Sequence, residues 1–194
     1  MNVKHASTYI SVLDYLDGEK ISDVKHEYIN GEVYAMAGAS RSHNILTGNV
    51  WSAFMAHLDG TRCISFSSDM KVNIDNQFFY PDVLVTCDDD LGDDYYTKAP
   101  IILVEVLSKS TRKMDKSFKL AAYKTIPSLL EYVLIEQEFA EIEICRRHSH
   151  WSSTHYFLGD DVYFESIDLT LSVEAIYRRV QNQDVIDYLQ AQAR

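Results

Sequence analysis

The apolar run at residues 101–107 constrains the fold more than any other part of the sequence. It consists of Ile-Ile-Leu-Val-Glu-Val-Leu, so aliphatic side chains occupy both its odd and its even positions. Alternate side chains of a strand point to opposite faces of the sheet, and a run that is apolar on both is typical of a central strand covered on both sides. The sequence therefore predicts a layered protein built around this strand.

Helical and strand-like segments lie on both sides of this run. We expect a helix from a Ser7 N-cap through residue 17, a hairpin at Asn30-Gly31, and a helix that Ser42 caps and that ends near residue 58. Strands are expected at residues 63–66, 70–74, 78–86, 131–135 and 141–145, a loop at 88–94, a helix at 113–124, and short strands and then helices after Trp151. This order predicts an α/β or α+β fold in which helices flank one mixed central β-sheet.

Length and hydropathy bound the organisation of the chain. It has 194 residues without internal repeats or a Pro/Gly-rich linker, so we expect one domain over residues 1–194 with a helical extension at 181–194. No apolar run approaches the roughly 20 residues that span a bilayer, and the N-terminal segment lacks the apolar core of a signal peptide. We therefore predict a cytoplasmic protein with no membrane partner.

The three cysteines, Cys63, Cys87 and Cys145, are far apart, and each lies in or beside an apolar strand-like run. The chain has no CxxC pair and no Cys/His spacing that would indicate a zinc site. We interpret the cysteines as reduced thiols that pack as small hydrophobic side chains. This interpretation agrees with a reducing compartment.

A carboxylate interrupts the central run. Glu105 lies inside the predicted strand, where a charge without a partner would be costly to bury. Asp82 follows Pro81 at the head of a second apolar strand, residues 83–85. Each acid alone has a structural explanation, because Glu105 could form an ion pair and Asp82 could simply begin a strand.

Together, the two carboxylates fit a divalent metal ion. Mg²⁺ prefers hard oxygen ligands and usually takes one or two carboxylates with several waters. Asp82 and Glu105 on adjacent strands, with the backbone carbonyl of Val106, would supply such a set and leave positions open for phosphate and water. A metal bound there would lower the pKa of water and neutralise charge that develops during phosphodiester hydrolysis.

A cation for the same reaction is expected on the helix after Glu105. Lys119 lies four residues after Asp115, so the two share a helical face, and its long side chain could reach back toward the strand ends. A solvated surface lysine is the alternative. Residues 109–119 are the most cationic stretch of an acidic chain, and this strip could bind phosphate or be a solvated helix face.

The order of these motifs resembles the Uma2 family of restriction-endonuclease-like proteins. The similarity runs from about residue 5 to residue 180 and is carried by Pro81-Asp82, residues 104–111, Asp115, Lys119, Tyr123, residues 131–134, and an opening motif at residues 27–36 followed by His43. The motifs are specific in combination, although none is specific alone.

The resemblance implies a PD-(D/E)XK nuclease core with Asp82 and Glu105 as the metal acids, Mg²⁺ as cofactor with Mn²⁺ as a substitute, and DNA as the expected substrate. It also implies that Glu27 reaches the metal or orients a water, whereas a charged residue on a solvent-facing strand is the alternative. In one respect the chain departs from the pattern. Leu107 occupies the place of the lysine expected two residues after the second acid, and Lys119 becomes its natural substitute.

The net charge of −11 counts against general binding of nucleic acid, which draws most of its affinity from cations that meet phosphates. A bound Mg²⁺ would reverse the sign of an acidic pocket. Two hypotheses follow: a metal-dependent endonuclease, or a catalytically degenerate nuclease fold that serves as a binding or interaction module. We also expect a homodimer, because cutting both strands of a duplex needs two sites. The C-terminal helical segment could pair with a second copy through Tyr177, Val180, Ile186 and Leu189.

Overall fold

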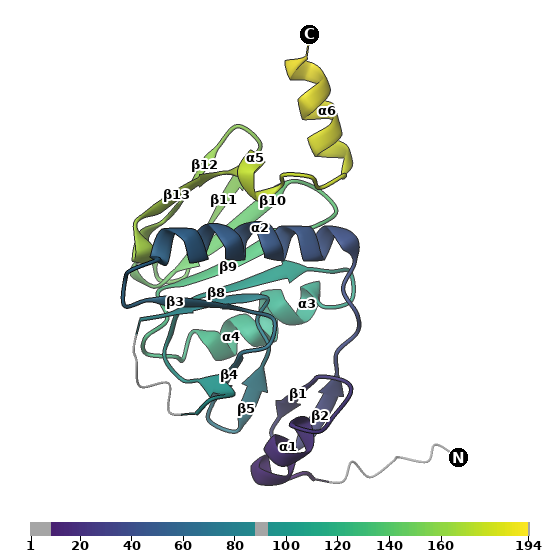
Figure 1. Ribbon diagram of the computed structural model, residues 1–194, viewed down its shortest axis with the longest axis vertical. Helices are drawn as coiled ribbons and strands as arrows, with labels where there is room; N and C mark the ends of the chain where they lie inside the picture. The colour runs from purple at the N-terminus through teal and green to yellow at the C-terminus, as the bar shows by residue number, and fades with distance from the viewer. Residues whose placement is uncertain (1–8, 88–92, 194) are drawn as a thin grey trace, which may run out of the picture.

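The computed structural model describes residues 9–87 and 93–193, and its centre is a six-stranded mixed sheet (Figure 1). The strand order is β11-β10-β9-β8-β6-β3. Their bounds are β3 (Ile64–Ser67), β6 (Val83–Thr86), β8 (Pro100–Leu107), β9 (Glu131–Glu136), β10 (Glu141–Arg146) and β11 (Ser153–Phe157). Strands β8 and β9 run parallel, and the other neighbours are antiparallel. The predicted fold class, a mixed sheet flanked by helices, is confirmed.

Strand β8 lies inside the sheet and is buried on both faces, as its sequence predicts. Val104 and Val106 join one hydrophobic cluster, whereas Leu103 and Leu107 join the other. Glu105 has the same parity as Leu103 and Leu107, so its side chain belongs to the second face. The alternation therefore decides which layer receives the buried acid.

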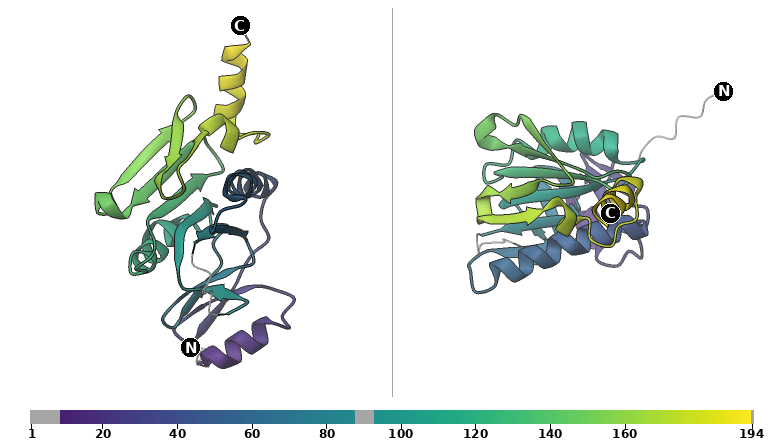
Figure 2. Two further views of the ribbon diagram at one scale, coloured as in Figure 1. Left: turned by 60° about the vertical axis from the view of Figure 1, so that its left-hand side comes forward. Right: turned by 90° about the horizontal axis from the view of Figure 1, so that it is seen from above.

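A helix covers each face of this sheet (Figure 2). Helix α2 (Arg41–Leu58) packs Leu46, Val50 and Phe54 against the first face. Its N-cap is Ser40, whose Oγ accepts a hydrogen bond from His43 N at 3.1 Å, so the predicted cap at Ser42 is wrong by two residues. Ser40 has the extended backbone that a cap requires, and Ser42 already lies inside the helix.

The second face is covered by a helix that contains a π-helical turn. It is made of α3 (Arg112–Met114), the π-helical segment η1 (Asp115–Lys119) and α4 (Leu120–Tyr123). The predicted helix at 113–124 is therefore present, but its middle is wound more loosely than an α-helix. Single π turns of this kind are frequent at functional sites.

A second sheet of five strands, in the order β2-β1-β5-β4-β7, was not expected from the sequence. Its strands are β1 (His26–Ile29), β2 (Glu32–Ala35), β4 (Lys71–Ile74), β5 (Gln77–Phe79) and β7 (Tyr96–Thr97), and α1 (Val12–Glu19) packs beside them. The predicted strand at 78–86 is divided between the two sheets, because Pro81 cannot donate to a ladder. Asp82 therefore lies where the chain passes from one sheet to the other.

The hairpin at Asn30-Gly31 is confirmed. Both residues have positive φ, 50° and 99°, and the turn joins β1 to β2. The N-cap of α1 is Ser11, whereas the predicted cap, Ser7, lies outside the described residues, as does most of the predicted loop at 88–94. The turn fixes the register of β1, which carries Glu27.

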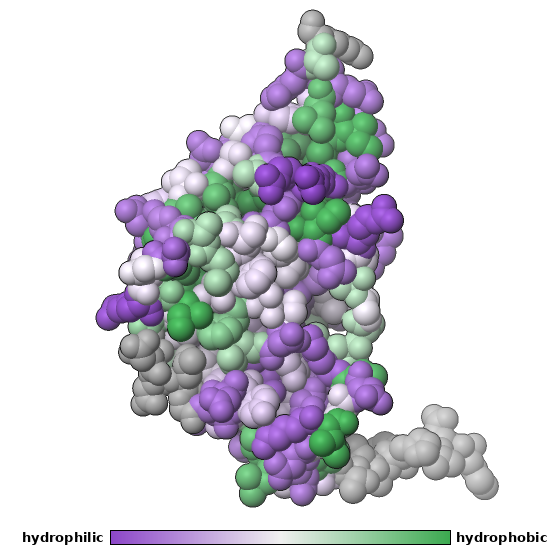
Figure 3. Space-filling model, viewed as in Figure 1, coloured by the Kyte–Doolittle hydropathy of each residue, from purple (hydrophilic) through white to green (hydrophobic). Residues whose placement is uncertain are grey.

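The C-terminal region contains the two-stranded sheet β12 (Asp161–Phe164) and β13 (Leu169–Ser172), and the helices α5 (Val173–Ile176) and α6 (Gln183–Gln192). Helix α6 projects from the rest of the molecule (Figure 1), and apolar side chains are visible on it (Figure 3). Among the described residues, no helix has the length and apolar character needed to cross a membrane.

The interpretation of all three cysteines as separate thiols is wrong for two of them. Cys63 and Cys87 form a disulfide, whereas Cys145 is free and buried. Strands β3 and β6 pair antiparallel with Ile64 opposite Thr86, which brings the preceding Cys63 and the following Cys87 face to face. Their separation of 24 residues gives no sign of this proximity in the sequence.

Candidate active site

The register of two antiparallel strands brings Asp82 and Glu105 together. In the β6–β8 ladder, Val83 is opposite Val104 and Leu84 is opposite Leu103. Asp82 directly precedes Val83 and Glu105 directly follows its partner Val104, so the two acids lie at the same end of this ladder. Their proximity agrees with the charge of Asp82, which helps to raise the pKa of Glu105.

The carboxylate of Asp82 accepts a hydrogen bond from the backbone of β8, as a carbonyl of a neighbouring strand would. Its Oδ2 accepts a hydrogen bond from Val106 N at 2.7 Å and lies 3.2 Å from His43 Nε2. The N–H and C=O of one strand residue point to the same side, so the carbonyl of Val106 also faces Asp82. The N-terminal end of α2, which carries His43, thereby holds one acid of the pair.

Lys119 lies at the centre of the acidic cluster. Its Nζ is 2.8 Å from Glu27 Oε1, 3.1 Å from Glu105 Oε1 and 3.3 Å from Asp115 Oδ1. The residue is only 5% exposed, so the alternative of a solvated surface lysine is wrong. Glu27 is 7% exposed, which likewise excludes a solvent-facing position on its strand.

The π-helical turn explains how Lys119 and Asp115 both reach the sheet. The turn spans the two residues, and both are buried there. The ammonium of Lys119 also lies 5.9 Å from the centroid of the Phe79 ring, at the boundary between the two sheets. Asp115 was expected only as a neighbour of Lys119 on one helical face. Sequence reasoning missed its place in the cluster. The spacing of four residues between Asp115 and Lys119 was the signal that could have indicated it.

Negative charge exceeds positive charge in this cluster. The carboxylates of Glu27, Glu105 and Asp115 contact one ammonium, that of Lys119, and the charge of a fourth carboxylate, Asp82, acts on Glu105. Burial raises the pKa of Glu105 well above its ordinary value, Lys119 opposes that rise, and the other three acids add to it. For Lys119 itself, burial favours a lower pKa, but Glu105, Glu27 and Asp115 raise the pKa above its ordinary value.

Tyr123 completes the surroundings of Glu105. Its hydroxyl donates to Glu105 Oε1 at 2.9 Å, and burial, followed by the charge of Glu105, raises the pKa of the phenol. The hydroxyl therefore stays protonated and acts as a hydrogen-bond donor that positions the carboxylate. Glu105 Oε1 thus receives both a lysine and a tyrosine.

The carboxylate oxygens of the cluster are ligands that a divalent cation prefers, but the side chains are not grouped as a three-ligand metal site among the described residues. Glu27 Oε1 and Asp115 Oδ1 are buried and accept no well-aligned hydrogen bond from any residue that the structure describes, although each faces the ammonium of Lys119. Within residues 9–87 and 93–193, no three His, Cys, Asp or Glu side chains are grouped so that they could hold a metal ion. A metal here would thus depend on two carboxylates and a carbonyl, a number that Mg²⁺ commonly accepts.

Most cations of the strip at residues 109–119 have acidic partners on β9, β10 and the turn between them. The pairs are Lys109 with Glu138, Arg112 with Glu136 and Glu138, and Lys116 with Glu143 and Glu136, while Lys119 is buried in the cluster. Lys113 is exposed and has no acid partner among the described residues. Lys119 is therefore not part of a solvent-facing strip, whereas binding of phosphate by the other four cations stays a prediction, because exposed pairs such as Lys109–Glu138 exchange easily.

Comparison with known proteins shows the family of the chain. Residues 13–174 match the model of a family described as "Uma2: Putative restriction endonuclease". Two proteins of Synechocystis sp. are similar to the chain: "Uncharacterized protein slr1290" is 36% identical over 174 residues, which cover 87% of this chain and 92% of that protein. The second, "Uncharacterized protein sll1609", is 35% identical over 156 residues, which cover 78% and 85%.

A solved structure has a similar fold. It is a crystal structure from Anabaena variabilis described as a "putative nuclease belonging to DUF820", with a TM-score of 0.72 and 16% sequence identity. The match covers 89% of this chain and 99% of that one. At this level of identity the likeness concerns the fold alone.

Proposed function

Because the chain belongs to the Uma2 family, described as "Putative restriction endonuclease", we propose that it is a metal-dependent endonuclease that hydrolyses phosphodiester bonds in DNA. The observation that carries this proposal is the buried cluster in which the carboxylates of Glu27, Glu105 and Asp115 contact the ammonium of Lys119, while the charge of Asp82 also acts on Glu105. Such a charge imbalance disfavours the folded state unless a cation joins it, and hydrolysis of phosphodiesters benefits from such a cation.

Asp82, Glu105 and the carbonyl of Val106 are the residues that would hold Mg²⁺, or Mn²⁺ in its place. The metal would supply a Lewis acid for the phosphate and lower the pKa of a bound water. The positions of the two acids at the same end of the β6–β8 ladder, and the hydrogen bond from Val106 N to Asp82, support this choice. The raised pKa of Glu105 has a consequence: metal must displace a proton, so affinity for the metal should rise with pH.

Lys119 has the role of a fixed cation in this proposal. Since its neighbours raise its pKa, the amine stays protonated and cannot serve as a general base. It can instead donate to a phosphate oxygen and stabilise the negative charge that grows in the transition state. Glu27, whose Oε1 accepts no well-aligned hydrogen bond from the described residues, can orient the attacking water and accept its proton.

The test is cleavage of supercoiled plasmid, linear duplex and single-stranded DNA with Mg²⁺ or Mn²⁺. Asp82→Asn should abolish cleavage while the protein stays folded, and Lys119→Met should slow it by about 10²-fold. Lys113→Met is the matched control, because this exposed lysine lies on the same helix outside the cluster. Equal rates for Lys119→Met, Lys113→Met and wild type would remove Lys119 from the reaction, and an active Asp82→Asn protein would refute the assignment.

One observation favours the second hypothesis, a nuclease fold that binds but does not cleave. Glu105 and Lys119 form a closed and buried ion pair, as expected of a structural contact. The two hypotheses separate in a cleavage assay with both metals. Binding of DNA by the wild-type protein, with no hydrolysis of any DNA form, would establish the binding module and reject the enzyme.

We also propose that the protein acts in the cytoplasm, where it would meet DNA. Disulfides are rare in that compartment, so the Cys63–Cys87 disulfide is the observation that counts against this location. Fractionation of cells should recover the protein together with cytoplasmic markers. Recovery with the exported or membrane fraction would contradict the cytoplasmic location.

A homodimer is the assembly we propose, because two copies would present two sites to the two strands of a duplex. Helix α6 offers a surface for the contact, since Ile186 is 38% and Leu189 58% exposed. The expectation that Tyr177 and Val180 also take part is wrong, because both are buried in the core of the chain. Light scattering should give twice the mass of the chain, and Leu189→Asp should shift the protein toward the monomer. A wild-type monomer at high concentration would reject the dimer.

A further inference from the structure

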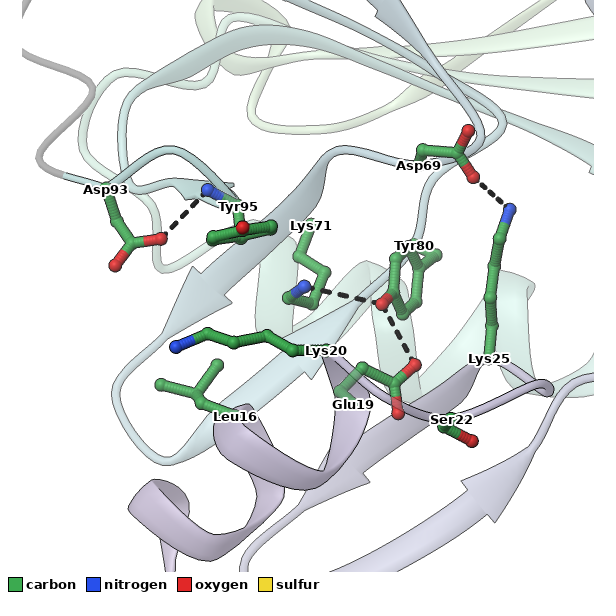
Figure 4. A pocket seen from close by; sticks show the side chains of 10 residues that line it. All are labelled: Leu16, Glu19, Lys20, Ser22, Lys25, Asp69, Lys71, Tyr80, Asp93 and Tyr95. Carbon is green, nitrogen blue, oxygen red and sulfur yellow. Dashed lines mark hydrogen bonds and ion pairs between the residues drawn. The ribbon is translucent and has the colours of Figure 1, made fainter.

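A cavity of about 250 Å³ lies beside α1 and β4, apart from the carboxylate cluster (Figure 4). Three lysines line it, Lys20, Lys25 and Lys71, together with the rings of Tyr80 and Tyr95. Lys20 and Lys25 lie in the connection between α1 and β1, whereas Lys71 begins β4. The fold therefore brings Lys71 to the other two cations.

Lys71 is the most unusual of these residues. It is 5% exposed, yet no carboxylate of the described residues lies within 4.0 Å of its ammonium. Its Nζ donates to the hydroxyl of Tyr80 at 3.3 Å and lies 5.1 Å and 5.7 Å from the ring centroids of Tyr80 and Tyr95. Burial lowers the pKa of Lys71, and the nearby charges of Glu19 and Asp93 oppose this effect. An ammonium has three donors, so Lys71 retains donors for an anion that enters the cavity.

The acids of the cavity are already engaged. Glu19 accepts hydrogen bonds from Tyr80 Oη at 3.0 Å and from His26 N at 2.8 Å, and its other oxygen lies 3.1 Å from His26 Nδ1. Asp69 pairs with Lys25, and Asp93 accepts from Tyr95 N at 2.8 Å. Lys20 has only an exposed pair with Asp17, a contact that contributes little and exchanges easily.

The cavity adjoins the carboxylate cluster through two short stretches of chain. Tyr80 is two residues from Asp82, and Lys25 is two residues from Glu27, so each pair of Cα atoms is at most about 7 Å apart. Alternation along β1 separates the two sites, because His26 contacts Glu19 whereas Glu27 contacts Lys119. An extended ligand that passes along these strands could therefore reach both sites.

We propose that this cavity binds a backbone phosphate of the same nucleic-acid strand that lies at the carboxylate cluster, with Lys71 as the main donor and Lys20 at the mouth. The inference rests on the proposed function. It adds a buried cation for phosphate to the largely paired strip at residues 109–119. Tyr95, 51% exposed at the edge of the cavity, offers its ring to a base of the bound strand.

The experiment measures binding without cleavage. A fluorescein-labelled single-stranded DNA of about 12 nucleotides is titrated with protein in EDTA, and anisotropy is followed from about 50 to about 200 mM salt. Lys71→Met should weaken binding by about tenfold and reduce the slope of log K against log salt by about 0.7, as expected for one lost phosphate contact. Lys20→Met, a change of an exposed residue that leaves the core intact, should weaken binding in the same direction by a smaller factor.

Lys98→Met is the matched control, because this exposed lysine follows β7 and does not line the cavity. Equal binding by the Lys71→Met, Lys20→Met and Lys98→Met variants would overturn the proposal, as would a wild type that does not bind the oligonucleotide at low salt. This outcome is distinct from failure of the proposed function. If binding depends on Lys71 but the Asp82→Asn variant cleaves DNA as fast as wild type, the cavity proposal is supported and the proposed active site is rejected.

Discussion

Two buried glutamates on adjacent strands of the main sheet have opposite surroundings. Glu131, at the start of β9, is 1% exposed and accepts hydrogen bonds from Arg146 Nε at 3.1 Å, Ser166 N at 3.0 Å and Glu165 N at 3.3 Å. Glu105, on β8, is 4% exposed and receives one lysine and one tyrosine in a cluster that contains three more acids.

The difference teaches that burial of an acid does not by itself indicate a site. Glu131 has donors enough to satisfy its charge, and these donors fix the 3-10 turn at Glu165–Ile167 against the sheet. Glu105 shares the ammonium of Lys119 with other carboxylates. The surroundings of Glu131 stabilise the fold, whereas those of Glu105 can accept a further cation. Four predictions can break or sharpen this contrast.

The largest expected effect is on cleavage. Glu105→Gln removes one negative charge from the proposed metal site and should lower the rate of Mg²⁺-dependent cleavage by about 10³-fold. Glu131→Gln is the paired variant, and its folded fraction should cleave as fast as wild type. Rates measured per folded molecule test the contrast, which breaks if both variants lose the same activity.

The next effect is on stability, where substitution of Glu131 should matter more than it does for cleavage. Glu131→Ala leaves Arg146 buried without its main partner, and the free energy of unfolding should fall by about 3 kcal/mol, or roughly 10 °C in Tm. Glu165→Ala, a change of a second and more exposed partner of Arg146, should cost less than about 1 kcal/mol. Urea unfolding measures both, and equal losses would show that Glu131 has no special role.

A third prediction concerns pH. The folded protein holds a proton on Glu105 above the ordinary pKa of 4.5, so folding takes up a proton between that value and the raised one. Stability from this group is therefore lost as pH rises through the folded pKa, by at most about 1.4 kcal/mol per pH unit.

Glu105→Gln removes this dependence. In metal-free buffer, the stability of the variant minus that of wild type should increase as the pH rises from 4.5, and the increase should end above the folded pKa. Unfolding curves of both proteins across this range give the difference. A difference that stays constant, or decreases with pH, would contradict the raised pKa.

The smallest effect is that of the metal on stability. Mg²⁺ at tenfold its Kd should stabilise the wild-type protein by about 1.4 kcal/mol, and chelation should reverse the gain. Glu105→Gln should lose this response, whereas Glu131→Gln should keep it. Thermal unfolding with Mg²⁺, Mn²⁺ and EDTA makes the comparison, and an equal response of both variants would place the metal elsewhere.

Much of the main sheet could be predicted because its signals are local. The apolar run of β8 specifies a central strand of this sheet, and in the second sheet the turn at Asn30-Gly31 likewise specifies its own hairpin. Asp82 and Glu105 were also identified individually, since a charge within or beside an apolar strand is visible in the sequence. Their proximity depends on the β6–β8 register, however, which no local pattern determines.

Features that depend on distant segments could not be predicted. The acids that neutralise Arg112 and Lys116 lie on β9 and β10. The cavity around Lys71 needs α1 to pack beside the second sheet, and that sheet arises because the chain leaves one ladder at Pro81 and enters another. Each of these contacts joins residues that are distant in sequence, so short-range periodicity carries no information about them.

The π-helical turn at Asp115–Lys119 has a consequence for the detection of proteins built this way. The wider turn rotates the following residues around the helix axis, as a one-residue insertion would. Lys119 therefore reaches the acids from a neighbouring helix and not from a fixed position along the strand after Glu105. Motif searches that count residues from the second acid will therefore overlook such a lysine. A search by spatial proximity of an ammonium to paired strand-borne carboxylates would retrieve it.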